Sequence, residues 1–157
     1  MKAVSNINIK KLLIMILTIL AVSLSAFFSQ ISFGAPASQV SDVQLLARAI
    51  NGEARGEPYE GQVAVGAVIL NRVKSADFPN SIAGVIYQPG AFTAVADGQI
   101  NVPIDPKSTV VKAAQDALNG WDPTYGCLYY WNPATATSKW IWSRKIVVKI
   151  GKHNFGK

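Results

Sequence analysis

Residues 59–74, YEGQVAVGAVILNRVK, place the strongest constraint on how this chain can fold. From position 63 to position 70 the residues are apolar without a break, so a helix formed here would be apolar on all sides. Such a helix is stable only when other elements surround it. We therefore predict a buried central helix, which Gly56 and Pro58 separate from the preceding segment as a helix stop and a helix start.

A second helix is predicted just before this one, through DVQLLARAINGEAR (42–55). Ser41, followed three residues later by Gln44, forms a capping-box pattern that is typical of a helix N-terminus. At about 100° per residue, the helix is amphipathic, with a polar face (Gln44, Arg48, Asn51, Arg55) opposite an apolar one (Val43, Leu46, Ala47, Ile50, Ala54).

The remainder of the chain changes in character from helical to β-rich. SIAGVIY (81–87) predicts a short helix capped by Ser81 or Asn80, and residues 88–103 predict loops. Asp105 and Pro106 are expected to open a third long helix, which Gly120 closes. The later segments CLYYWN, KWIWSR and KIVVKI are aromatic and β-branched, as in short strands or a hairpin. The predicted fold class is α+β, mostly helical, with a small β element near the C-terminus.

Three carboxylates, Glu53, Glu57 and Glu60, lie within eight residues where the first two helices meet. Glu53 falls on the apolar side and in the last helical turn, where the helix dipole presents negative charge. Both surroundings disfavour ionisation, so we expect Glu53 to keep the proton that a general acid needs; a structural role at a helix end is the alternative. Glu60 is interpreted as a structural first-turn glutamate, and Glu57 as either a helix-start charge or an active-site neighbour.

A cluster of aromatic residues near the C-terminus suggests the kind of ligand. Amide, hydroxyl and guanidinium groups are interspersed with these rings, and such a mixture suits sugars, which have apolar faces and polar edges. The alternative is that the rings fill a small core. The aromatic residues are Tyr125, Tyr129, Tyr130, Trp131, Trp140 and Trp142.

The composition excludes several classes of protein. The single cysteine, Cys127, excludes an internal disulfide and is interpreted as a small buried hydrophobe. The single histidine, His153, excludes a His-rich metal site, and a structural role is favoured for it. The formal charge of +6 falls to +3 without the three lysines of residues 1–37. The remaining basic residues do not cluster, so we do not expect nucleic-acid binding. We also expect no metal and no other cofactor.

Residues 1–37 have the layout of a secretory signal peptide. A basic start is followed by the apolar run LLIMILTILAVSLSAFF and by small residues, and cleavage after Ala37 would leave Ala35 at the third position back. The run is long for a signal peptide, so an uncleaved membrane anchor is the alternative. Either way, residues 38–157 would form one exported domain.

Several motifs, in order, closely resemble the catalytic domain of SleB-type spore cortex-lytic enzymes, a cell-wall hydrolase family. They are NGEARGEPYEGQVAVGAVILNRV, FPNSIAGVIY, AFTAVADGQI, NGWDPT, LYYWNPATATSKWIWSR and IGKHNFGK. The resemblance covers about residues 42–157. It implies a lysozyme-like fold related to lytic transglycosylases, and it implies that Glu53 is the catalytic acid and base on cortex peptidoglycan in the germinating spore.

The resemblance predicts cleavage of the bond between N-acetylmuramic acid and N-acetylglucosamine with a 1,6-anhydromuramic product. A hydrolytic muramidase using Asp97 or Glu57 as a second carboxylate, and a non-catalytic peptidoglycan-binding module, are the alternatives. We expect substrate contacts from polar and aromatic residues of the motifs: Glu57, Thr93, Tyr130, Asn132 and Trp142. The predicted location is the spore cortex or cell wall. We expect a monomer that acts on glycan strands, with an accessory spore-membrane protein as a further partner.

Overall fold

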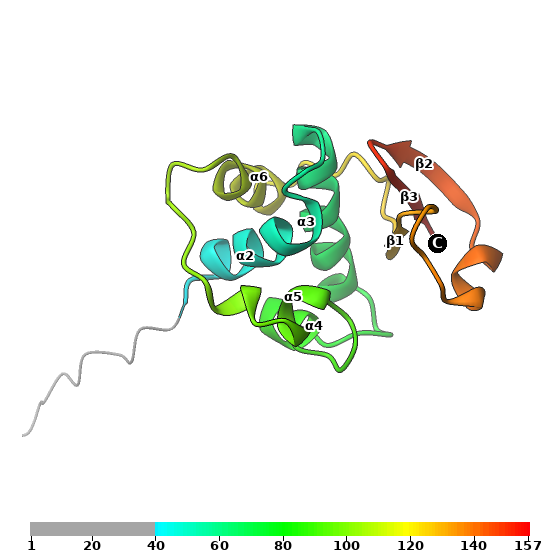
Figure 1. Cartoon of the computed structure of the whole chain (residues 1–157), viewed down its shortest axis with the longest axis horizontal. Coiled ribbons are helices and arrows are strands. Elements are labelled where there is room, and N and C mark those ends of the chain that lie inside the picture. Colours follow the sequence, from blue (N-terminus) through cyan, green and yellow to red (C-terminus); the bar gives the residue numbers. More distant parts are fainter. Residues whose placement is uncertain (1–39) are drawn as a thin grey trace, which may run out of the picture. The chain divides into compact units, whose positions relative to one another are not determined.

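The computed structural model describes residues 40–157, so the predicted signal peptide at residues 1–37 lies outside the described residues. Helix α3 (Tyr59–Lys74) runs through the middle of the domain (Figure 1). Every residue from Gly61 to Ile69 is buried, as the unbroken apolar run predicted. Pro58 is the residue before the first helical one, one position earlier than expected.

Helices α2 (Asp42–Ala54) and α6 (Thr109–Leu118) pack against α3 and build most of the core. The predicted cap of α2 is present, because the Ser41 hydroxyl accepts a hydrogen bond from the backbone N–H of Gln44 at 3.3 Å. The three helices meet closely at Gly66. A Cβ added there would lie 3.0 Å from Ile50 Cδ1 and 3.2 Å from Ala117 Cβ.

Shorter elements cover the end of the bundle at which α2 finishes. Helix α4 (Ile82–Ile86) is capped by Ser81, whose hydroxyl accepts from the N–H of Gly84 at 3.1 Å. The segment predicted as loop contains helix α5 (Thr93–Ala96) and the 3₁₀ helix η1 (Gln99–Asn101). Both of these contact α2.

The predicted β element is a three-stranded antiparallel sheet in the order β1-β3-β2. Its strands are β1 (Tyr129–Trp131), β2 (Ile146–Ile150) and β3 (His153–Gly156). The central strand β3 is buried along its whole length. The sheet lies beside α3, and the contacts of α3 with β1 and β2 join it to the helices (Figure 1).

Two expectations for individual elements were wrong, and one strand was not predicted. KWIWSR is not a strand but contains the 3₁₀ helix η2 (Lys139–Ser143). Ile141 is buried between two exposed tryptophans, and this alternation of buried and exposed residues is the same as in a strand with one buried face. The third long helix begins at Thr109, because Asp105 instead forms a turn in which its carboxylate accepts from the N–H of Lys107 at 2.9 Å. Strand β3 was not predicted, since HNFG has little intrinsic β character and is extended by pairing on both sides.

Among residues 40–157, none of the helices has both the length and the apolar character needed to cross a bilayer.

The close approach at Gly66 predicts that Gly66→Val destabilises the fold. The added side chain must displace Ile50 or Ala117 in a packed core, which costs about 1–3 kcal/mol of unfolding free energy. Gly56→Ala is the control, because a Cβ at Gly56 meets nothing within 4 Å. Urea unfolding followed by circular dichroism measures both variants. Equal midpoints for the two would contradict this account of the packing.

Candidate active site

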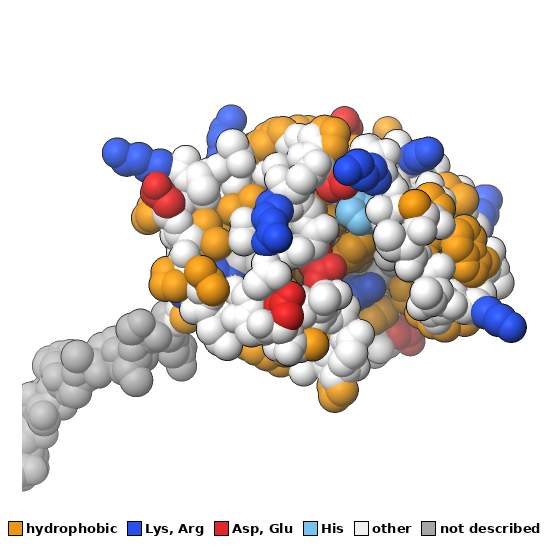
Figure 2. All heavy atoms as spheres, viewed as in Figure 1, with side chains coloured by type: hydrophobic (Ala, Val, Ile, Leu, Met, Phe, Trp, Pro, Cys, Tyr) orange, Lys and Arg blue, Asp and Glu red, His pale blue; other side chains and the backbone are white. Residues whose placement is uncertain are grey.

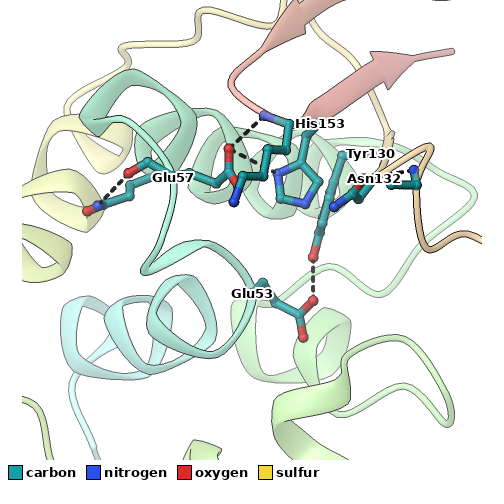
Figure 3. A network of polar contacts seen from close by, with 8 residues as sticks. Glu53, Glu57, Tyr130, Asn132 and His153 are labelled. Carbon is teal, nitrogen blue, oxygen red and sulfur yellow. Dashed lines mark hydrogen bonds and ion pairs between the residues drawn. The ribbon is translucent and has the colours of Figure 1, made fainter.

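Glu53 lies in the last turn of α2, and both of its carboxylate oxygens accept a hydrogen bond from another element. Oε1 accepts from the backbone N–H of Ala94 at 3.3 Å, and Oε2 accepts from the Tyr130 hydroxyl at 3.2 Å. Figure 3 shows the phenol of Tyr130 pointing directly at the carboxylate. The carboxylate is therefore held between helix α5 and strand β1.

The sequence around Glu53 explains this arrangement. The N–H of Ala94 belongs to the first turn of α5, where backbone donors have no partner inside the helix. Gly52 allows α5 to come close, because a Cβ at that position would collide with Cβ of Ala94. Gly52, inside the amphipathic helix α2, thus lets α5 come close enough for the N–H of Ala94 to bind Glu53.

A cavity of about 530 Å³ lies over this carboxylate. Four of the residues predicted to contact substrate line it together with Glu53, namely Glu57, Thr93, Tyr130 and Asn132. Trp142 does not line it, and this residue is 51% exposed to solvent. Acidic, basic and histidine side chains come to the surface close together on the face shown in Figure 2.

A second cavity of about 490 Å³ adjoins the first. The two share six lining residues: Arg72, Ala91, Tyr130, Trp131, Thr135 and Ala136. Aromatic rings line the second cavity, where Tyr129 and Trp140 pack edge to face with centroids 5.4 Å apart. Among residues 40–157, no acidic side chain lines it. The aromatic cluster predicted from the sequence is thus divided between cavity walls, core and open surface.

Glu57 is tied to the turn between β2 and β3. Its Oε2 accepts from the backbone N–H of Lys152 at 2.8 Å and lies 3.9 Å from Nδ1 of His153. Only 7% of its side chain is exposed. Glu60, by contrast, is exposed on the surface, in agreement with its interpretation as a structural glutamate.

Asp97, the other candidate for a second carboxylate, lies outside both cavities. Its two oxygens accept from the backbone and the side-chain amide of Gln99, at 3.0 and 2.8 Å. It occupies a turn with Gly98, whose φ of 81° is left-handed. The turn that its neighbours suggested is therefore present.

His153 lines the Glu53 cavity, although a structural role was favoured for it. Its ring packs edge to face on Tyr130 with centroids 5.4 Å apart. Burial lowers the pKa of His153 below its ordinary value of 6.5, while the charges of Glu57 and Glu53 act in the opposite direction. The imidazole is therefore neutral near pH 7.

Tyr130 and Cys127 are both kept in their protonated forms. Burial, with the nearby charge of Glu53, raises the pKa of Tyr130 well above its ordinary value. The phenol therefore remains a donor to Glu53 over the physiological pH range. Burial also raises the pKa of Cys127, which has no exposed surface, as expected for a small hydrophobe rather than a nucleophile.

Sequence reasoning missed Arg72 and Lys152 as lining residues. Arg72 comes from the C-terminal half of α3 and lines both cavities, and Lys152 lies in the β2–β3 turn. An arginine two residues after the apolar run of a buried helix was the available signal for Arg72. For Lys152 no local pattern existed. Within residues 40–157, no group of three or more His, Cys, Asp or Glu side chains is placed to hold a metal ion.

A sequence profile of the family described as Cell Wall Hydrolase matches residues 56–156. The chain belongs to this cell wall hydrolase family. A spore cortex-lytic enzyme of Bacillus cereus is 65% identical over 117 residues, which are 74% of this chain and 44% of that protein. The chain spans less than half the length of the spore cortex-lytic enzymes it matches.

Two solved structures share the fold of this cell wall hydrolase. The catalytic domain of SleB from Bacillus cereus is 62% identical with a TM-score of 0.70, covering 76% of this chain and 94% of that one. The catalytic domain of the germination-specific lytic transglycosylase SleB from Bacillus anthracis is 61% identical with a TM-score of 0.72, covering 78% and 99%. These matches confirm the predicted family and fold class. The profile match begins three residues after Glu53 and therefore does not include that residue.

The geometry around His153 predicts its titration. Nuclear magnetic resonance of the chain's one histidine should give a pKa below 6.5. Glu57→Gln should lower that pKa further, because the charge of Glu57 raises the pKa of His153 more than the charge of Glu53 does. Glu53→Gln should lower it by a smaller amount. An unchanged or raised pKa in Glu57→Gln would contradict the placement of this pair.

Proposed function

We propose that this cell wall hydrolase cleaves spore cortex peptidoglycan during germination, as a lytic transglycosylase acting between N-acetylmuramic acid and N-acetylglucosamine. The observation that carries the proposal is the Glu53 carboxylate, which is held by two donors and lines a cavity in a domain with a TM-score of 0.72 to a lytic transglycosylase catalytic domain. The names of relatives more than 60% identical to this chain supply the substrate.

In the proposed reaction, Glu53 serves first as an acid and then as a base. Its carboxyl group protonates the glycosidic oxygen as the bond from that oxygen to C1 of the muramic acid breaks, and positive charge develops on the sugar. The ionised Glu53 then accepts the proton of the sugar's own 6-hydroxyl while that oxygen bonds to C1. The product is a 1,6-anhydro ring, and Glu53 is returned to its protonated form without consuming water.

The surroundings of the other carboxylates favour this reaction over hydrolysis. A muramidase of the ordinary kind needs a second carboxylate that is free to act as nucleophile or as base for a water molecule. Asp97 lies outside both cavities, and Glu57 is almost fully buried with one oxygen engaged by the backbone of Lys152. Glu53 is therefore the carboxylate that we assign to the chemistry.

Contacts with the glycan are assigned to the polar and aromatic lining of the cavities. Thr93 is exposed at the start of α5, and Asn132 lies beside Tyr130 (Figure 3), so both can meet the polar edge of a sugar. Trp140 supplies an exposed ring on the wall of the second cavity. We propose that Glu57 supports the wall of the cavity, and we assign no glycan contact to Trp142 because it lines neither cavity.

The setting of the enzyme follows from the same proposal. Cortex peptidoglycan lies outside the cytoplasmic membrane, so residues 1–37 would serve as the export signal or as an anchor. An accessory spore-membrane protein and a monomeric state remain predictions from the family resemblance.

Glu53→Gln should abolish release of soluble glycan from purified sacculi, with a loss of at least ~100-fold, because the amide cannot donate or accept the catalytic proton. Glu60→Gln, an exposed glutamate of the same acidic segment, is the matched control and should keep wild-type activity. Binding to sacculi and thermal unfolding establish that both variants fold. Undiminished release by folded Glu53→Gln would refute the catalytic role.

Gly52→Ala should reduce turnover without removing any polar group. The new methyl group displaces Ala94, whose N–H holds Oε1 of Glu53, so the carboxylate loses one of its two anchors. We expect a roughly 10- to 100-fold loss of kcat, the size of effect produced by misplacing a catalytic group by about 1 Å. Gly56→Ala, four residues away, should be neutral; equal kcat values for the two variants would contradict this role of Gly52.

A further inference from the structure

Arg72 lies where the two cavities join, and its guanidinium group is only partly engaged by the protein. Its Nε donates to the carbonyl of Leu128 at 2.7 Å. Within residues 40–157 its two terminal nitrogens make no hydrogen bond, and Arg72 forms no ion pair with a carboxylate. These nitrogens are also not among the fully buried, unsatisfied polar atoms, so they face the cavities whose walls Arg72 forms.

The guanidinium group is held in place by aromatic rings. Its central carbon lies 5.2 Å from the ring centroid of Phe78, 5.7 Å from that of Phe92 and 5.8 Å from that of Tyr129. Such contacts stabilise a cation without using its N–H donors. Burial nevertheless lowers the pKa of Arg72, which means that the charge is incompletely compensated. A fixed cation with free donors at the floor of a cleft is suited to an acceptor group on a ligand.

The preferred partner of such a guanidinium is a planar group with two oxygens, or an amide carbonyl. On the proposed substrate, the group of this kind that distinguishes muramic acid from glucosamine is the lactyl substituent on C3. It belongs to the same ring whose C1 is attacked beside Glu53. With the reacting carbon over Glu53, the substituent can extend toward the junction of the cavities and into the second, acid-free cavity.

We propose that Arg72 binds the carbonyl oxygen or carboxylate of the muramic acid lactyl group and thereby selects muramic-acid glycans over chitin-like ones. This inference rests on the proposed function. The competing interpretation gives Arg72 a structural role, in which it ties α3 to the start of β1 through Leu128.

The test measures the binding of two soluble tetrasaccharides in a Glu53→Gln background, where no turnover occurs. One is an alternating N-acetylglucosamine and N-acetylmuramic acid tetrasaccharide with free lactyl carboxylates, and the other is chitotetraose. Titration calorimetry should show preference for the muramic acid sugar. Adding Arg72→Gln should reduce that preference roughly tenfold or more, because hydrogen bonds to a charged group are lost for one ligand and not the other.

Arg72→Lys is the second variant, because it keeps the positive charge but loses the planar fork. It should also lose most of the preference, and a muramic acid tetrasaccharide with amidated lactyl groups shows whether a carbonyl alone suffices. If folded Arg72 variants bound both sugars more weakly by the same factor, the inference would be overturned in favour of the structural role. An unchanged preference for the muramic acid sugar would overturn it as well. If the Glu53→Gln protein bound neither sugar, the proposed function would fail as well.

Discussion

The burial of α3 on all sides is the constraint on which the rest of the structure depends. Its apolar surface is covered by α2 and α6 and is also met by α4 and by the small sheet. Gly66 shows how close this packing is, since even a methyl group there would press on two neighbouring helices. With α3 enclosed, the end of α2, the start of α5 and strand β1 meet beside its C-terminal half, and Glu53 lies at their meeting point.

The site joins elements that are distant in the sequence. Tyr130 is 77 residues from the carboxylate to which it donates, and Ala94 is 41 residues from it. Glu57 and His153 support the wall formed by the β2–β3 turn, and Arg72 forms part of both cavities. Near pH 7 the groups around the Glu53 carboxylate include a neutral His153, a protonated Tyr130 and a cationic Arg72.

Local patterns made the helices predictable. The N-cap at Ser41, the apolar run of α3 and the acid at the end of α2 depend on neighbours within a few residues, and the structure contains all three. Strand β3 and the position of His153 in the cavity wall depend on pairing and packing between distant segments, which no local pattern encodes. For Arg72 a local signal existed, but its position in the walls of both cavities depends on the same long-range packing. The sequence placed Glu53 on an apolar side; in the structure its carboxylate is instead bound by two polar donors.

The central claim is that one carboxylate carries out the reaction, with the sugar's own hydroxyl as nucleophile. Mass spectrometry of soluble muropeptides released from spore-cortex sacculi by the purified protein tests it most directly. The account predicts products that end in 1,6-anhydromuramic acid, lighter by one water than hydrolysis products. Products with reducing muramic acid ends from the earliest time points would contradict the account, because they require an activated water and a second catalytic group.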